Sequence, residues 1–219
     1  MAQKKLENVW QKGRKQMLND VTVFNIREYL SAKGDKDLGE DELRQLLSEF
    51  FCDKNPDVER FLKEQSIEFT KKNQSVTYLV FSNEDASLVG YFTITIKPIT
   101  VNAENFSNTM KRKIARVSEL DEENGTYTLS AYLIAQLGKN FKDGANEKIT
   151  GEQLLHAAVD TIKELQYMAG GMVIFHEAED NDKLMHFYDK NGFKQFDVRE
   201  MKCRDKDEIH KLVQLLKVM

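Results

Sequence analysis

The sequence predicts an α/β protein with one mixed sheet and helices packed on its faces. Two observations lead to this fold class. Residues 77–81 and 88–96 are rich in β-branched and aromatic residues and are joined by a short polar segment, which predicts an antiparallel hairpin. From residue 131 onward, strand-like and helix-like segments alternate, which is typical of βαβ units. With 219 residues, 41% of them hydrophobic, the chain is long enough for one sizeable packed domain.

The N-terminal part begins with a predicted helix and a predicted strand. Apolar side chains at helical spacing make residues 4–18 a polar amphipathic helix, and residues 21–30 alternate in the manner of a strand. The helix precedes every motif that carries chemistry. We therefore expect an N-terminal helical extension over residues 1–20 and one domain over residues 21–219.

The following segments read as helices on either side of the hairpin. Residues 39–50 place leucines on one helix face. Asn55 comes directly before Pro56, and this pair is typical of a helix cap and the first helical position. After the hairpin, residues 102–128 are polar but contain apolar residues spaced four apart, which predicts a short amphipathic helix.

The last third of the chain alternates between strands and helices. Leucine and alanine recur at helical spacing after residue 151, and two consecutive glycines end that helix. The final strand could also be helical. The expected strands are residues 131–137, 172–178, 193–199 and 212–218, and the expected helices are residues 151–167 and 182–191.

Composition and charge exclude several classes of protein. The net charge of −4 argues against broad, non-specific binding to nucleic acid, which needs many Lys and Arg contacts to phosphate. Neither Cys52 and Cys203 nor the histidines have metal-ligand spacing, so we assign no metal. No apolar run approaches the roughly twenty residues of a membrane span, and the N-terminus lacks the apolar core of a signal peptide. We expect a cytoplasmic protein.

The segment over residues 138–155 has the chemistry of a phosphate-binding loop. Thr150 and Gln153 have capping-box spacing, so a helix is expected to begin at Gly151. The first amides of that helix carry a partial positive charge and point into the loop, and Lys148 adds a cation. A capped strand-to-helix connection without a ligand has the same residues, so the loop alone leaves both interpretations open.

A second motif lies about thirty residues farther along the chain. Asn181 is followed by Leu184 at the third position, then by Tyr188 and by the run KNGF at positions 190–193. This pattern resembles the GNAT superfamily of acyl-CoA-dependent N-acetyltransferases, with a leucine in place of the more usual alanine. The resemblance implies a central mixed, mostly antiparallel sheet flanked by helices.

The resemblance extends upstream through the loop. Residues 136–140 look like the end of the family's fourth strand, and Gly151 matches the end of its pyrophosphate-loop motif. Asn146 stands where the family usually has Arg or Gln, Ile149 stands in place of the middle glycine, and the loop is longer than the common form. Because backbone amides make most of the phosphate contacts in such loops, the resemblance still implies CoA binding.

A third segment is similar to one subgroup of this superfamily. Phe51 and Cys52, then Asn55 and a helix with Phe-Leu at positions 61–62, precede a strand that begins with Thr-Tyr at positions 77–78. This order resembles that of toxin-like acetyltransferases of aminoacyl-tRNA. The resemblance then covers the chain from residue 21 to its end.

The resemblance also implies how acetyl-CoA, the co-substrate, would bind. The fourth and fifth strands, residues 131–137 and 172–178, would splay apart around the pantetheine arm. Main-chain groups at the end of the fourth strand would pair with the pantetheine amides, loop amides would hold the pyrophosphate, and an asparagine of the second motif would lie near the arm. The implied cofactor-binding residues are Leu137, Gly138, Lys139, Asn146, Glu147, Lys148, Ile149, Thr150, Gly151 and Asn181.

In this family an amine attacks the thioester directly, and the leaving thiolate takes a proton from an acid. Tyr188 matches the family's acid, and the ordinary pKa of a phenol, about 10, lies modestly above that of a thiol. A tyrosine that packs in the core and hydrogen-bonds a neighbour is the alternative. The general base is not identified, because His176 and Glu177 alternate along their strand and at most one faces the substrate.

The leading interpretation is an acetyl-CoA-dependent N-acetyltransferase that acts on a primary amine. The acceptor amine and the oligomeric state, a homodimer included, stay open. A toxin-type acetyltransferase of aminoacyl-tRNA is the first alternative, favoured by the basic residues 111–116 and opposed by the acidic net charge. A non-catalytic module of the same fold is the second, favoured by the departures at Asn146 and Ile149. Binding of acetyl-CoA distinguishes the module from both enzymes.

Overall fold

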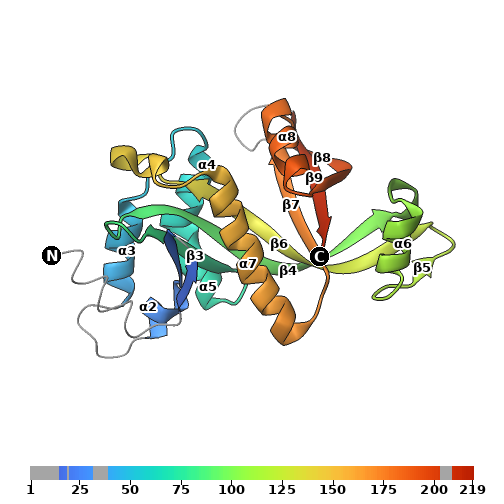
Figure 1. Cartoon of the computed structure of the whole chain (residues 1–219), viewed down its shortest axis with the longest axis horizontal. Coiled ribbons are helices and arrows are strands. Elements are labelled where there is room, and N and C mark those ends of the chain that lie inside the picture. Colours follow the sequence, from blue (N-terminus) through green and yellow to red (C-terminus); the bar gives the residue numbers. More distant parts are fainter. Residues whose placement is uncertain (1–14, 19, 32–38, 203–208) are drawn as a thin grey trace. The chain divides into compact units, whose positions relative to one another are not determined.

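The computed structural model describes residues 15–18, 20–31, 39–202 and 209–219 (Figure 1). The chain divides into two compact units, and both take part in a sheet because two long strands run through both. As far as they are described, the ranges of unit 1 are Met1–Thr95 and Ile134–Thr161, and those of unit 2 are Ile96–Leu133 and Ile162–Met219.

The strands form an open sheet in the order β1-β2-β3-β4-β6-β7-β9-β8, and β5 pairs with β6. Antiparallel pairing joins β1 to β2, β2 to β3, β3 to β4, β5 to β6, β7 to β9 and β8 to β9. The predicted α/β class with a mixed, mostly antiparallel sheet is confirmed. The strands are β1 (Lys15–Leu18), β2 (Val21–Asn25), β3 (Val76–Ser82), β4 (Leu88–Asn102), β5 (Leu120–Asp121), β6 (Thr126–Lys139), β7 (Val173–Glu179), β8 (Lys194–Lys202) and β9 (Ile209–Val218).

Helices connect these strands. Three of them, α4, η1 and α5, follow one another without a break, and the middle one is a π-helical turn. Within the described residues, no helix has the length and the apolar character to cross a membrane. The helices are α2 (Arg27–Ser31), α3 (Glu40–Ser48), α4 (Pro56–Arg60), η1 (Phe61–Gln65), α5 (Ser66–Lys71), η2 (Ala103–Asn105), α6 (Asn108–Ile114), η3 (Lys142–Glu147), α7 (Gly151–Ala169) and α8 (Asp182–Lys190).

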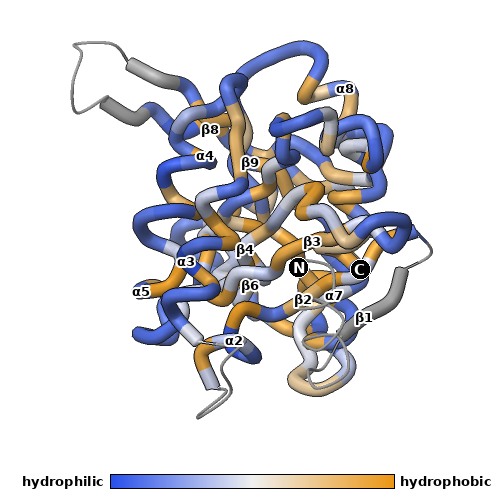
Figure 2. The backbone as a smooth tube through the Cα atoms, turned by 90° about the vertical axis from the view of Figure 1, so that its left-hand side faces the viewer, coloured by the Kyte–Doolittle hydropathy of each residue, from blue (hydrophilic) through white to orange (hydrophobic). Residues whose placement is uncertain are grey.

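Unit 1 packs helices α2 to α5 against β2, β3 and β4. Figure 2 shows hydrophobic residues, in orange, along β2 and β3. The Asn55 side chain accepts a hydrogen bond from Val58 N at 3.3 Å, and Pro56 occupies the first turn, as the cap prediction requires. The core of unit 1 consists of Phe24, Ile26, Tyr29, Leu43, Leu47, Phe50, Cys52, Val58, Leu62, Ile67, Leu79, Phe81, Leu88 and Tyr91.

Unit 2 has its own core, in which β7 and β9 pair and α6 packs on the β4–β6 hairpin. In Figure 1, α6 and β5 close the far end of this hairpin. The Phe175 and Phe196 rings lie 5.9 Å apart, and Asn105 Nδ2 donates to Phe196 O at 2.6 Å. The core of unit 2 consists of Ile99, Val101, Ala103, Ile114, Tyr127, Leu129, Ala131, Val173, Phe175, Phe196 and Leu216.

Two predictions at the N-terminal end need correction. Residues 15–18, expected to end a helix, form β1 and pair with β2, while residues 1–14 lie outside the described part. The strand expected over residues 21–30 ends at Asn25, whose Oδ1 accepts from Arg27 N at 2.9 Å. Such a local side-chain bond turns the chain and starts a short helix, which alternation of residue types does not reveal.

Candidate functional site

The end of β6 is held by Asn140, whose side chain is buried in unit 1. Asn140 Nδ2 donates to Leu88 O at 2.8 Å, and its Oδ1 accepts from Phe51 N at 2.9 Å and from Lys142 N at 3.1 Å. Phe141 N–H also donates to Phe51 O at 2.7 Å. The segment that resembles the toxin-like subgroup therefore lies directly against the exit of β6. Sequence reasoning placed Asn140 in a motif but missed this bonding role.

Gly138, one of the residues implied to pair with pantetheine, leaves no room for a side chain. A Cβ built there would lie 2.4 Å from Val58 Cγ1 and 3.3 Å from Tyr91 Cε1. Tyr91 is itself fixed, because its hydroxyl donates to Val58 O at 2.6 Å. The neighbouring Leu137 and Lys139 are half-buried at the same strand end. Burial is the larger cause that lowers the pKa of Lys139, and the positive charge of the nearby Lys54 is the smaller one.

Gly90 on β4 brings the end of β6 close to the first turn of α7. A Cβ built at Gly90 would lie 2.9 Å from Gly138 O and 3.2 Å from both Leu154 methyl carbons. The main chain of β6 and the side chain of Leu154 thus pack on the same glycine. Two groups of predicted cofactor residues, at the strand end and at the helix start, are neighbours in unit 1.

The loop between them turns sharply within η3. Asp143 and Gly144 have φ values of 50° and 76°, in the left-handed region. Glycine adopts this region freely, and aspartate is one of the few other residues that tolerate it. The predicted loop residues Asn146 and Glu147 follow this turn; Asn146 is half-buried and Glu147 is exposed. The left-handed pair makes the sharp turn within η3.

The capping box that the spacing predicted is present at the start of α7. Gln153 N donates to Thr150 Oγ1 at 3.1 Å, and Thr150 N donates to Gln153 Oε1 at 2.8 Å. No protein group in the described ranges accepts a hydrogen bond from Ile149 N or Gly151 N. The Ile149 side chain is buried, with 1% of its surface exposed. The loop therefore offers two N–H donors that remain available beside a helix N-terminus.

Lys148 is not a free cation. Its Nζ forms an ion pair with Asp85 and lies 3.2 Å from Ser87 Oγ, on the turn between β3 and β4. The hydrogen bond from Lys148 is the main cause that lowers the pKa of Asp85 to about 2. Asp85 is therefore charged at neutral pH and balances Lys148. Sequence reasoning missed this carboxylate, because nothing in a linear pattern links positions so far apart.

In unit 2, the second motif builds a helix with a fixed cap and a fixed end. Asn181 Oδ1 accepts from Lys183 N at 3.0 Å and from Leu184 N at 3.4 Å, so the predicted cofactor residue Asn181 caps α8. At the other end, Gly192 has a φ of 81°, and Phe193 N–H donates to Tyr188 O at 3.0 Å. The run at positions 190–193 thus forms the turn that ends α8 directly after Tyr188.

Tyr188, the predicted acid, is buried and hydrogen-bonded to a histidine. Its hydroxyl lies 2.7 Å from His176 Nε2 on β7, and the exposed fractions of the two residues are 5% and 7%. Burial raises the pKa of Tyr188. The adjacent Glu177 instead accepts from Gln214 Nε2 at 2.9 Å and lies 3.6 Å from Arg199 Nη1. Of the two strand residues left open by the sequence, His176 is the one on the Tyr188 side.

Among the residues searched, which are those that the structure describes, no three His, Cys, Asp or Glu side chains gather to hold an ion. Unit 1 offers a pair of N–H donors and a lysine paired with a carboxylate. Unit 2, taken by itself, offers a phenol beside an imidazole.

The packing at Gly138 gives a direct test. We expect Gly138→Ala to lower the free energy of unfolding by about 1–3 kcal/mol, because the new methyl group overpacks against Val58. Shortening Val58 to alanine should relieve part of the loss, so the double variant should be more stable than the sum of the single changes predicts. Urea unfolding of the four proteins measures this coupling, and strict additivity would show that the contact is not made.

No family model and no curated protein matches the chain. Solved structures do. AtaT complexed with acetyl-methionyl-tRNAfMet has a TM-score of 0.56 at 16% identity, over 89% of this chain and 94% of that one. A mutant of KacT has a TM-score of 0.54 at 16% identity, over 89% of this chain and 94% of that one. An AtaT mutant toxin bound to the C-terminus of the antitoxin AtaR and acetyl-CoA has a TM-score of 0.50 at 15% identity, over 89% of this chain and 93% of that one. At this identity the match shows a shared fold: the chain has the fold of AtaT and KacT, which is the GNAT-like fold that its motifs predicted.

Proposed function

We propose that this protein is an N-acetyltransferase that moves an acetyl group from acetyl-CoA to a primary amine. The observation that supports the proposal is the buried Tyr188 hydroxyl, because Tyr188 matches the acid of the GNAT-like sequence motif and the chain has that fold. One structure of the same fold is an AtaT mutant with acetyl-CoA bound, which supports the choice of co-substrate.

The cofactor would be held mainly by main-chain groups of unit 1. The free N–H groups of Ile149 and Gly151 would donate to the pyrophosphate, helped by the partial charge of the α7 N-terminus. Lys148 would exchange the Asp85 carboxylate for a phosphate. Main-chain groups at the end of β6 would pair with the pantetheine amides. The further residues proposed for cofactor binding are Leu137, Gly138, Lys139, Asn146, Glu147, Thr150 and Asn181.

The chemistry is a direct transfer. A neutral amine attacks the thioester carbonyl, the new N–C bond forms, the nitrogen releases one proton to solvent, and the C–S bond breaks. The sulfur leaves as a thiolate and takes the phenolic proton of Tyr188. Because burial keeps Tyr188 protonated, this proton is present throughout the neutral pH range.

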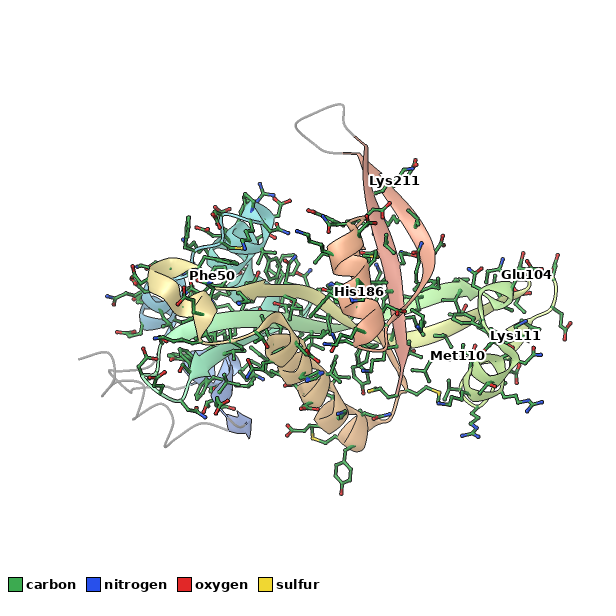
Figure 3. The ribbon with its side chains drawn as sticks, turned by 45° about the horizontal axis from the view of Figure 1, so that its top comes forward. Phe50, Glu104, Met110, Lys111, His186 and Lys211 are labelled. Atoms are coloured by element: carbon green, nitrogen blue, oxygen red, sulfur yellow. The ribbon has the colours of Figure 1, made fainter. Side chains whose placement is uncertain are left out.

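A second candidate is transfer to the α-amine of an aminoacyl-tRNA. AtaT, which shares the fold, has been seen in complex with acetyl-methionyl-tRNAfMet. In this chain, α6 carries Lys111, Arg112 and Lys113, and no ion pair involves these side chains among the described residues. Lys111 is labelled in Figure 3. A phosphate-rich substrate would suit such a cluster.

Calorimetry with acetyl-CoA tests the cofactor loop. We expect micromolar binding that weakens about tenfold in Lys148→Met, because a charge-assisted bond to phosphate is lost. Asp85→Asn should bind acetyl-CoA more tightly, because Lys148 no longer has to leave a carboxylate. The two changes therefore act in opposite directions on one ion pair. No binding at millimolar acetyl-CoA would favour the non-catalytic module instead.

Replacement of Tyr188 by phenylalanine tests the acid. We expect kcat to fall by about 10²–10⁴, the usual contribution of a positioned acid, while the affinity for acetyl-CoA is kept. Tyr167→Phe is the matched control, because Tyr167 on α7 is 92% exposed. Turnover that survives in Tyr188→Phe across neutral pH would show that another group supplies the proton.

Salt dependence separates the two acceptors. If the acceptor is a charged tRNA, kcat/KM should fall steeply as salt rises, because binding releases counterions from phosphates. If it is a small amine, kcat/KM should change little over the same range. Rates with both acceptors between low and moderate salt measure this. A flat response with aminoacyl-tRNA would remove tRNA as the substrate.

A further inference from the structure

We propose that His176 is a positioning residue for Tyr188: its Nε2–H donates to the phenolic oxygen and leaves the Tyr188 O–H free to protonate the departing thiolate. The inference rests on the proposed acetyl transfer. It gives a role to a buried titratable side chain that the reaction scheme leaves unused.

The geometry brings the two groups together without ambiguity. Tyr188 Oη and His176 Nε2 are 2.7 Å apart, and the two rings have centroids 4.8 Å apart at 45°. Both side chains are buried in unit 2. They come from different elements, α8 and β7, that are each fixed: α8 by its Asn181 cap and β7 by its antiparallel pairing with β9. The contact is therefore part of the folded core of unit 2.

The surroundings of the phenol make this partner important. The Phe187 and Phe193 rings lie edge-on to Tyr188, with centroids 5.0 and 5.7 Å away, and they offer no hydrogen bond to its oxygen. When the thiolate takes the phenolic proton, a phenolate forms at this buried position. A buried anion is costly unless a donor faces it. The Nε2–H of His176 is such a donor, at hydrogen-bond distance.

The direction of this hydrogen bond decides whether Tyr188 can act as an acid. A phenol has one proton. If Tyr188 donated that proton to an unprotonated Nε2, its O–H would point at the imidazole and not at the sulfur. If Nε2 carries the proton and donates, the oxygen accepts and its own proton points elsewhere. We therefore assign His176 the tautomer with hydrogen on Nε2. The bond becomes stronger as the phenolate forms, because its acceptor becomes charged.

The reaction balances with this hydrogen bond in place. The amine nitrogen bonds to the acetyl carbon and releases one proton to solvent, the C–S bond breaks, and the sulfur takes the Tyr188 proton. The Nε2–H stays on His176 and stabilises the phenolate until the phenol is protonated again from solvent. His176 therefore acts through Tyr188 and need not touch the substrate.

Steady-state kinetics of two His176 variants test the proposal. We expect His176→Leu to lower kcat by about tenfold to a hundredfold, the usual worth of a hydrogen bond to a charged group. His176→Gln keeps an N–H donor and should retain most of the wild-type kcat. Acetyl-CoA affinity and the thermal midpoint should stay close to wild type in the glutamine variant. In the Tyr188→Phe background, His176→Leu should have no further effect on kcat.

The matched control is His186→Leu. His186 is also on α8 but is exposed, and it is labelled in Figure 3. We expect its kcat to equal that of wild type. A merely structural role for His176 would lower stability in both His176 variants and give no rescue by glutamine.

The ¹⁵N spectrum of labelled histidine reads the tautomer directly and needs no activity. The signals of His176, assigned by their loss in His176→Gln, should show a protonated Nε2. An unprotonated Nε2 in the resting protein, or an unchanged kcat in His176→Leu, would overturn the proposal while acetyl transfer stands. A wild-type protein that neither binds nor uses acetyl-CoA would overturn the proposed function and the role of His176 with it.

Discussion

The buried amide of Asn140 is the contact on which the loop of unit 1 depends. It bonds to the main chain of three segments: Phe51 between α3 and α4, Leu88 at the start of β4, and Lys142 at the start of η3. Each main-chain group that lost this partner would be left unsatisfied, at a cost of about 1–3 kcal/mol. The strand end, with Gly138 packed on Val58, and the loop that follows are therefore placed by one side chain.

Short-range interactions explain what could be predicted from the sequence. The Thr150–Gln153 capping box joins residues three positions apart, and the turn after Tyr188 is formed by the run at positions 190–193. The central hairpin and α7 follow the periods of strand and helix. The predicted end of β2 was wrong, because the Asn25 side chain accepts a hydrogen bond from Arg27 N and ends the strand where the alternation of residue types continues.

Long-range contacts explain what could not be predicted from the sequence. Asn140 and Phe51 are 89 positions apart, and Lys148 and Asp85 are 63 apart. A single sequence shows that a lysine lies in the loop, but not that a carboxylate on another turn already balances it. The strand residues 176 and 177 illustrate the same limit: alternation says that they face opposite ways, and only the packing of α8 says which of them meets the phenol.

The π-helical turn Phe61–Gln65 has a consequence for how insertions and deletions are tolerated. Such a turn holds one residue more than an α-helical turn of the same kind. An α-helix advances by about 100° per residue, so the extra residue sets the rotation of α5 relative to α4. If all the residues were kept and the segment became α-helical, α5 would turn by about 100° relative to α4 and Ile67, now 3% exposed, would swing off the core, whereas deleting one residue there would leave Ile67 in place. The π-helical turn thus takes up one extra residue and keeps the apolar faces of α4 and α5 on the same side.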